Sequence, residues 1–426
     1  MQAGFYTIMA AQFFSSLADN ALLVAAIQML RDLESPAWMT PSLKQVFVIS
    51  YVLLAPLVGA FADSMPKGRV MLITNGIKIC GCALMLFTLH PLMAYALVGL
   101  GAAAYSPAKY GILTELLPAR QLVIANGWIE GATVASIILG VVLGGLLISG
   151  PISSFLLAID IPKIETGVET PPQAAIAVIM GCYAIAALFN WYIPDTGVDR
   201  RVASKNPVFL IREFGHCCAL LWRDKLGQIS LATTTLFWGA GATLQFIVID
   251  WAATHLCYNL SRASMMQGIV AVGIALGAAL AALMVSLKSA VKVLPLGVLM
   301  GVVVIAMIAV NTLESAIVLM TLIGAFAGFF VVPMNALLQH RGHVLMGAGH
   351  SIAVQNFNEN IGVLVMLALY AIIVHVGLST NVAIVLFGLF VAGAMTLVMW
   401  RHRQNLAAGD VMHLVASDHA EAKAGP

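Results

Sequence analysis

Long apolar segments follow one another along most of this chain and leave few charged residues to cover a water-exposed surface. About twenty apolar residues are enough for one helix to cross a bilayer. Charged residues make up 9% of the 426 residues and apolar residues 61%, whereas soluble domains carry about 25% charged residues. The sequence therefore predicts an all-α polytopic membrane protein with twelve transmembrane helices.

The predicted helices form two groups of six. We place them near residues 5–30, 43–62, 69–89, 92–113, 124–149 and 173–193, and then near 227–254, 264–286, 291–311, 313–338, 347–375 and 380–400. This pattern predicts an N-terminal six-helix bundle over 1–193, a cytoplasmic linker over 194–226, a C-terminal six-helix bundle over 227–403 and a disordered cytoplasmic tail over 404–426.

Two connecting segments have recognisable patterns. Residues 207–225 place apolar side chains on one helical face and basic ones on the other, which predicts an amphipathic helix lying on the membrane surface. Residues 151–172 contain acidic residues and prolines and predict an ordered or semi-ordered external loop. Basic residues gather in alternate loops, and cytoplasmic loops are the ones that collect them, so both termini are expected in the cytoplasm.

The two groups of helices repeat each other in sequence. Gly99 to Lys109 in the fourth predicted helix is echoed by Gly324 to Asn335 in the tenth, since both strings begin with Gly and end with Pro, an apolar residue and a polar residue. The openings of the fifth and eleventh helices, Asn126 to Glu130 and Asn356 to Asn360, also match. Repeated halves with a site between them are typical of transporters.

Asp19 and Asn20 lie in the middle of the first apolar segment. A carboxylate at that depth costs about 2.5 to 3.5 kcal/mol on insertion and, when unpaired, usually marks an ion or substrate path. Asp19 with Asn20 could bind Na⁺ through hard oxygen ligands, and a proton is the alternative coupling ion. Lys78 is also deep in its helix, where we expect Asn75 or a bound lipid group as its partner.

Other polar side chains in the predicted spans are weaker candidates. Lys109 and Glu130 lie in successive helices at similar depth, so we predict an ion pair that reduces the burial cost of each; it either holds the helices together or acts in gating. Glu359 reaches a depth comparable to that of Asp19. Three amides, which commonly link neighbouring helices, complete the candidate binding residues: Gln245, Asn335 and Asn356.

The loop from Gly59 to Arg69 connects the second and third predicted helices. Asp63 stands at a helix end, with Lys67, Gly68 and Arg69 beyond it, an arrangement that suits a cytoplasmic latch made of charge pairs and backbone contacts. The loop resembles the signature loop of the major facilitator superfamily, with a longer stretch between Asp63 and Gly68 than the usual pattern has.

Longer strings resemble one family of that superfamily, the bacterial lysophospholipid transporters. They are Gln12 to Leu23, Gly101 to Leu113, Leu236 to Gly241, Gly328 to Gln339 and Gly347 to Asn360. The resemblance implies inward movement of lysophospholipids, chiefly lysophosphatidylethanolamine, across a Gram-negative inner membrane. It also implies a cytoplasmic-side partner that reacylates the lipid, an acyltransferase/acyl-carrier-protein synthetase.

One position departs from this family. Gln245 stands where the family has a basic residue, and Asp250 stands where it has an apolar one. If the family's basic residue holds the lipid phosphate, Lys109 or another donor must do so in this chain.

Other functions remain open at this stage. A drug or small-metabolite permease of the same fold would carry the same signature loop. A membrane-embedded lipid-modifying enzyme would need a nucleophile with its base, and a non-transporting scaffold would leave Asp19 unexplained. We find no catalytic constellation, no metal-ligand spacing among His340, His343 and His350 and no nucleotide-binding turn, and we expect neither a resident cofactor nor a nucleic-acid partner.

Overall fold

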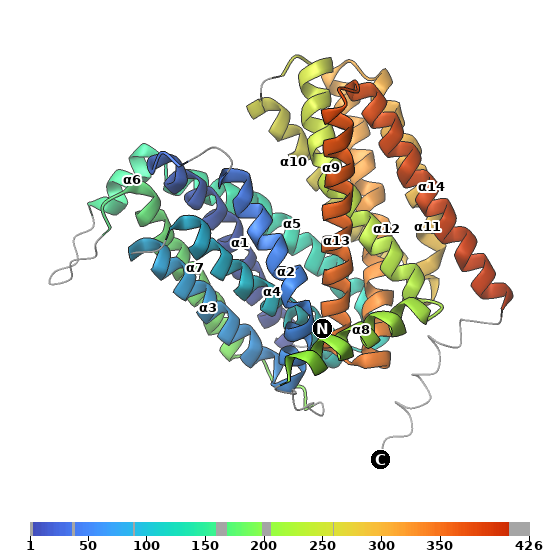
Figure 1. Cartoon of the computed structure of the whole chain (residues 1–426), viewed down its shortest axis with the longest axis horizontal. Coiled ribbons are helices and arrows are strands. Elements are labelled where there is room, and N and C mark those ends of the chain that lie inside the picture. Colours follow the sequence, from blue (N-terminus) through green and yellow to red (C-terminus); the bar gives the residue numbers. More distant parts are fainter. Residues whose placement is uncertain are drawn as a thin grey trace. The chain divides into compact units, whose positions relative to one another are not determined.

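The computed structural model describes residues 3–35, 39–87, 90–158, 168–197, 206–258 and 260–408. Helices account for nearly all of this part of the chain, and no strand occurs in it (Figure 1). In chain order they are α1 (Ala3–Asp32), α2 (Met39–Ser64), α3 (Lys67–Phe87), α4 (Pro91–Leu116), α5 (Leu122–Leu147), α6 (Gly150–Leu157), α7 (Pro171–Trp191), α8 (Pro207–Arg223), α9 (Gly227–His255), α10 (Leu260–Met284), α11 (Leu294–Ile305), α12 (Leu313–Met346), α13 (Ala348–His375) and α14 (Thr380–Ala407).

Eleven helical segments of the described chain are long and apolar enough to cross a membrane. One of them, Leu287–Ala309, combines α11 with the short 3₁₀ helices at its two ends. α4 does not reach the same apolar content because Pro91, Tyr95, Tyr105 and Pro107 interrupt its apolar residues, but it is 26 residues long and mostly buried. With α4 the segments become twelve, as the sequence predicts, and the all-α polytopic fold is confirmed.

Helix boundaries follow from local sequence. α7 begins with Pro171 and Pro172 in its first turn, where a missing N–H costs nothing, and the Gln173 side chain accepts from the Thr170 N–H at 3.0 Å. Ser379 caps α14. α12 and α13 are separated by Gly347 at φ +92°, a backbone conformation that favours glycine.

The chain divides into two compact units that do not coincide with its N- and C-terminal halves. The first unit contains Met1–Leu116, Ala135–Gly215 and Gly347–Asn356, and the second contains Leu117–Val134, His216–Met346 and Phe357–Pro426. α5, α8 and α13 therefore each contribute residues to both units. The six-plus-six division at residues 193 and 227 stays a prediction.

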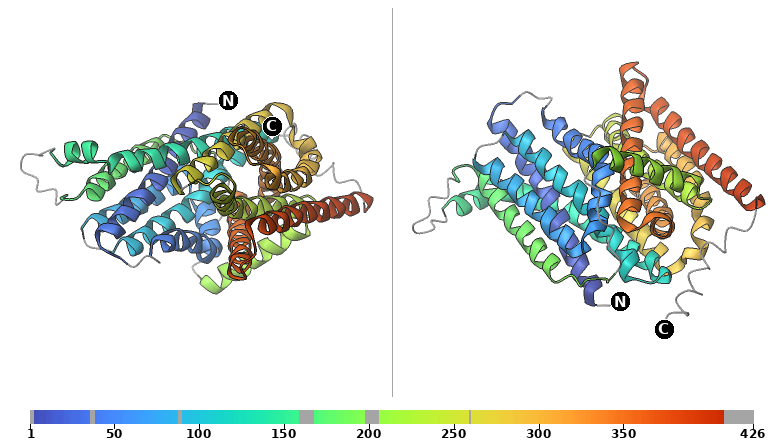
Figure 2. Two further views of the ribbon diagram at one scale, coloured as in Figure 1. Left: turned by 90° about the horizontal axis from the view of Figure 1, so that it is seen from above. Right: turned by 60° about the horizontal axis from the view of Figure 1, so that its bottom comes forward.

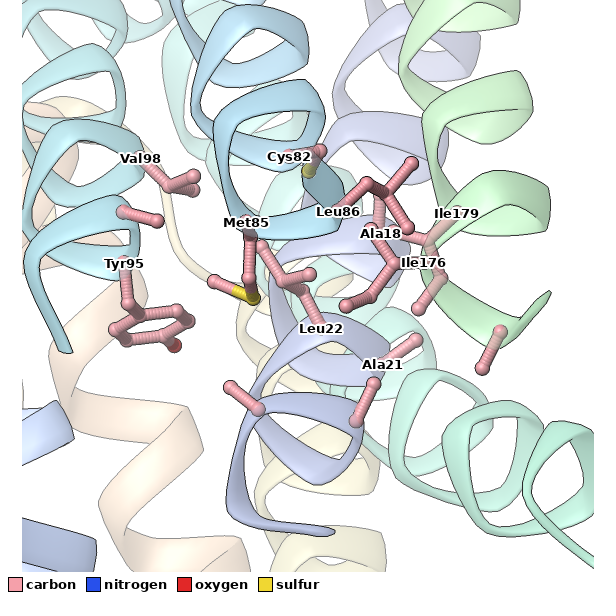
Figure 3. Close-up of a cluster of buried hydrophobic side chains, with 14 of the residues drawn as sticks. Ala18, Ala21, Leu22, Cys82, Met85, Leu86, Tyr95, Val98, Ile176 and Ile179 are labelled. Carbon is pink, nitrogen blue, oxygen red and sulfur yellow. The ribbon is translucent and has the colours of Figure 1, made fainter. Parts of the chain in front are cut away.

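Within the first unit, α1 packs against α7, α3 against α4 and α7, and α2 against α4. These helices, coloured blue to green, run side by side in the views of Figures 1 and 2. Figure 3 shows the apolar core that they share. The labelled residues come from α1 (Ala18, Ala21, Leu22), α3 (Cys82, Met85, Leu86), α4 (Tyr95, Val98) and α7 (Ile176, Ile179). This core borders the polar site described below. Ala18 is adjacent to Asp19 in α1, and Cys82 lies one helical turn after Lys78 in α3.

Within the second unit, glycines allow helices to approach closely. α10 packs along α12, and a Cβ atom added at Gly277 or Gly328 would collide with the backbone of the opposite helix. α11 packs against α14 in the same way through Gly301 and Gly388. Such small-residue contacts are common between membrane helices because lipid supplies no hydrophobic driving force between them.

Some connecting segments differ from the sequence-based predictions. Part of the segment expected as an external loop, Gly150–Leu157, forms the short helix α6, in which Pro151 takes an early position that suits proline. α14 continues through Ala407, so residues 404–407 are not part of a disordered tail; the Asn405 side chain donates to the Lys225 carbonyl at 2.9 Å and holds this end. The rest of that predicted tail, residues 409–426, lies outside the described residues.

Candidate functional site

A polar cavity of about 350 Å³ opens inside the first unit. α1 supplies Asp19 and Asn20 to its lining, and α4 supplies Lys109. Its remaining polar lining residues are Gln12, Ser15, Ser16, Lys44, Tyr51, Lys78, Tyr95, Tyr105 and Ser106. Three of the binding residues that the sequence predicts thus share one cavity.

Asp19 is paired at the edge of this cavity. The Lys78 ammonium donates to both carboxylate oxygens of Asp19 at 2.9 and 2.8 Å, and the Tyr183 hydroxyl donates to Oδ1 at 2.6 Å. The expectation of an unpaired carboxylate is therefore wrong, and Lys78 has a partner other than Asn75 or a lipid. One acid and one base at similar depth in two spans indicated that the two could pair. The sequence did not show which side chains of α1 and α3 meet in the folded bundle.

Helical spacing extends the pair into a network. Ser15 lies one turn before Asp19, and Asn75 lies one turn before Lys78, so each pair shares a helix face. Lys78 donates to the Ser15 hydroxyl at 3.1 Å, and Ser15 donates to Asn75 at 2.8 Å. Ser15 thus links the Lys78 ammonium to the Asn75 side chain.

Lys78 is almost completely enclosed. Its side chain is 1% exposed while that of Asp19 is 20% exposed. The Lys78 Nζ atom lies 5.0 Å from the ring centroid of Tyr105 and 5.4 Å from that of Tyr183, distances at which an aromatic face attracts a cation. Both residues line the cavity, and Asp19 is the more accessible of the two.

The cavity carries an excess of positive charge. Lys44, Lys78 and Lys109 line it, whereas Asp19 is the one carboxylate in its lining. The Lys109 ammonium lies 4.1 Å from the ring centroid of Tyr110. Asp19 pairs with Lys78, and Lys44 and Lys109 add further positive charge to the lining.

Asn20 and Asn356 border this cavity in different ways. The Asn20 amide donates to the Ser16 carbonyl of its own helix at 2.8 Å. The Asn356 amide donates to Ser106 of the cavity lining at 2.9 Å, and both residues belong to the first unit.

Asp63 forms the centre of the predicted latch. It accepts from the backbone N–H groups of Gly349 and His350 at 2.7 and 3.1 Å, and its Oδ2 lies 2.7 Å from His350 Nδ1. These groups stand in the first turn of α13, where unpaired N–H groups and the helix dipole favour a carboxylate. Lys67 donates to Asp63 at 2.6 Å from the other side.

The other residues of the predicted latch differ in their contacts. A Cβ at Gly59 would lie 3.1 Å from the His350 Cα atom, so glycine permits the close approach of α2 and the start of α13. Lys67 also lies 3.4 Å from Glu115 of α4. Gly68 packs against Ile193, and Arg69 is exposed and makes no ion pair with any described residue. The sequence did not single out His350 or Glu115 as partners.

Polar residues of the second unit form a different network. Asn335 donates to Glu130 at 3.3 Å, and Asn126 and Gln339 exchange two hydrogen bonds of 2.9 Å. Lys109 belongs to the first unit and Glu130 to the second, so their ion pair stays a prediction. Glu359 is buried in the second unit.

The second unit also contains a cavity of about 250 Å³ with a mainly apolar lining. Gln245 lines it and donates to Gln267 at 2.8 Å. The surrounding residues include Phe237, Ile274 and Phe387. Gln245 therefore forms an uncharged polar pair in an apolar cavity. No group of three or more metal-ligating side chains occurs in the described ranges.

Comparisons with known proteins agree with this architecture. Residues 8–342 match the model of the Major Facilitator Superfamily. The chain is 42% identical over 371 residues to proteins named lysophospholipid transporter LplT from Yersinia pestis (strain Pestoides F) and Yersinia pseudotuberculosis serotype O:3 (strain YPIII), covering 87% of this chain and 86% of each relative. Relatives of this kind are transporters and do not support the lipid-modifying enzyme.

Solved structures share the fold at low sequence identity. The human organic anion transporter MFSD10 (TETRAN) superposes with a TM-score of 0.73 at 15% identity, covering 94% of this chain and all of that one. A bacterial homologue of the iron transporter ferroportin in an outward-facing state gives 0.70 at 12% identity over 95% of this chain and all of its own.

Proposed function

Since the chain belongs to the major facilitator superfamily and, within it, to the family of the lysophospholipid transporters, we propose that it moves lysophospholipids across a bacterial inner membrane. The expected cargo is chiefly lysophosphatidylethanolamine, carried toward the cytoplasmic leaflet by alternating access. Both termini would then lie in the cytoplasm, and an acyltransferase/acyl-carrier-protein synthetase on that side would reacylate the product.

The observation that carries this proposal is the charge of the polar cavity. Its lining has three lysines against one carboxylate, which suits the phosphate of a lysophospholipid head group. Lys109 and Lys44 are the donors that would replace the basic residue absent at position 245.

The Asp19–Lys78 pair supports a way to couple the cargo to an ion. A proton or Na⁺ bound to Asp19 would neutralise its carboxylate and weaken its hold on Lys78. The Lys78 ammonium would then be available to the phosphate, because a buried cation needs an anionic partner. In this scheme Lys78 changes its anionic partner from Asp19 to the phosphate. The side-chain oxygen of Asn20 is a further, neutral ligand for an ion bound to Asp19.

The Asp63 contacts support a gating role for the start of α13. Gly347–Asn356 belongs to the first unit and the rest of α13 to the second. Release of Gly349 and His350 from Asp63 would free the start of α13 from the first unit. This would permit the alternation between the state open to the cytoplasm and the state open to the opposite side of the membrane. Gly59, Lys67, Gly68, Arg69 and Glu130 are proposed to serve the same transition.

Uptake in spheroplasts tests the proposal. Cells that express the chain should accumulate radiolabelled lysophosphatidylethanolamine, and Lys109→Gln should reduce uptake at matched expression. Lys288→Gln, at an exposed lysine outside both cavities, is the control and should transport normally. Export of common drugs without lipid uptake would overturn the assignment.

A further inference from the structure

The imidazole ring of His350 lies between two carboxylates. Its Nδ1 atom is 2.7 Å from Asp63 Oδ2, and its Nε2 atom is 3.9 Å from Glu213 Oε2. Asp63 stands in the last turn of α2, Glu213 in α8 and His350 in the first turn of α13, and all three belong to the first unit. The predicted latch therefore includes a titratable ring that joins three helices.

The contacts of Asp63 determine which ring nitrogen carries the proton of a neutral His350. Oδ1 of Asp63 accepts from the Gly349 N–H and from Lys67, and Oδ2 accepts from the His350 N–H and lies next to the ring. So many donors favour the ionised carboxylate. An ionised carboxylate only accepts, so Nδ1 is the ring donor. The Nε2 atom of the neutral ring then has a lone pair and offers Glu213 no proton.

The charged groups around the ring favour a second proton on it. α2 contributes Asp63, α4 contributes Glu115 and α8 contributes Glu213, while α3 contributes Lys67, which contacts both Asp63 and Glu115. In this group of described side chains three carboxylates surround one ammonium. An imidazolium at His350 would add positive charge between two of the carboxylates, and its Nε2 could donate toward Glu213.

We propose that His350 is a proton-operated lock on the latch. The ring binds a second proton between Asp63 and Glu213, and the imidazolium holds the start of α13 against α2 and α8. Histidine is the residue that commonly changes its charge between pH 5 and 8. The ring binds this proton more tightly while both carboxylates contact it than after the latch opens, so by linkage a lower pH favours the latched state.

Glu213 gives the lock access to water. Its side chain is 31% exposed, whereas that of His350 is 6% exposed. Leu210 and Phe214, on either side of it in α8, are buried and fix the turn that carries Glu213. α8 is thereby part of the gate as well as a connecting helix. The effect on transport rests on the proposed gating role of Asp63: acidification on the side of the latch should slow the cycle.

The test is hydrogen exchange, measured by mass spectrometry, of the peptide that contains Gly349 and His350 in the full-length protein in detergent. Both N–H groups donate to Asp63 and exchange when the latch opens. After correction for the intrinsic effect of pH, exchange in the parent should be about tenfold slower at pH 6 than at pH 8. Equal corrected rates at the two pH values would overturn the proposal.

Variants locate the titrating group. His350→Gln keeps a side-chain donor for Asp63 but cannot gain a proton, so its corrected rates should be equal at pH 6 and pH 8. Glu213→Gln should reduce the pH effect, since one carboxylate fewer faces the ring. His375→Gln, at an exposed histidine at the other end of α13, is the control and should respond like the parent. A full pH effect in His350→Gln would overturn the lock, and an unchanged effect in Glu213→Gln would remove Glu213 from it.

Uptake of lysophosphatidylethanolamine, measured separately, distinguishes failure of the lock from failure of the proposed function. A pH-dependent latch in a chain that takes up no lysophospholipid would contradict transport and leave the lock in place. Normal uptake together with pH-independent exchange would contradict the lock alone.

Discussion

The Nζ atom of Lys78 lies 2.8 Å from the Oδ2 atom of Asp19, and Tyr183 donates to the other carboxylate oxygen. A carboxylate inside a membrane span is therefore neutralised by its own protein in this state. The same contact predicts that Asp19 contributes to stability in addition to its proposed role in transport, which the sequence alone did not indicate.

Asp19→Asn should lower both uptake and stability. It leaves the enclosed Lys78 ammonium without a counter-charge, and removal of one partner of a buried pair costs about 3 to 5 kcal/mol, less here because Asp19 is partly exposed. The double variant Asp19→Asn/Lys78→Gln should recover much of the melting temperature in detergent while uptake stays low. Additive losses in the double variant would mean that the pair does not contribute to stability.

Asp63→Ala should shift the conformational equilibrium rather than abolish binding of the cargo. It removes the acceptor of two N–H groups and of His350 at the start of α13. A loss of about 1.4 kcal/mol changes a population ratio about tenfold. Labelling of a cysteine introduced at Asn335 should rise, and labelling of cysteines placed on the external side should fall. Asp63→Asn, which keeps an acceptor, should give a smaller change; identical labelling of parent and Asp63→Ala would exclude a gate at this loop.

Charge reversal tests the predicted ion pair between Lys109 and Glu130. Each single reversal should lower the melting temperature, and the double variant Lys109→Glu/Glu130→Lys should restore part of it if the two side chains interact in any state of the cycle. The measure is the coupling energy of the double-mutant cycle. A coupling energy near zero would contradict the predicted pair, while the contact of Glu130 with Asn335 would be unaffected.

Gly277→Leu should destabilise the second unit because even a Cβ there collides with the backbone of Ala325. Gly393→Leu is the matched control, since no atom lies within 4 Å of a Cβ at that helical position. The control should be neutral or slightly stabilising, by up to about 1 kcal/mol, because Gly is a poor helix former. The test compares the melting temperatures of the two variants in the same detergent. Equal values would contradict close packing of α10 on α12.

Cys218 in α8 should react slowly with maleimides at neutral pH. Burial, and next the neighbouring Cys217, raise the pKa of its thiol to about 11, and the thiolate is the reactive form. Because the pKa is raised, the reactive fraction should grow about tenfold per pH unit between pH 7.5 and 9.5 without reaching a plateau. Mass-spectrometric labelling rates of the peptide test this; a plateau below pH 9 would contradict the raised pKa.

The sequence by itself determined the architecture, because membrane helices are specified by long apolar segments. It also indicated Asp19, Lys109 and Asp63 as important, since polar groups in spans or at their ends are costly and stand out. α6 and the extension of α14 to Ala407 were missed because short helices and helix ends depend on contacts such as that of Asn405 with Lys225.

Only the tertiary structure decided which polar groups meet. Lys78 is distant from Asp19 in sequence, as His350 is from Asp63, and their pairing depends on how α1 packs near α3 and how α2 approaches α13. The same holds for the approach of Glu213 to His350. Apolar periodicity specifies that a helix forms and how long it is, but the choice of neighbouring helix depends on side-chain packing and close glycine contacts, which are properties of the assembled bundle.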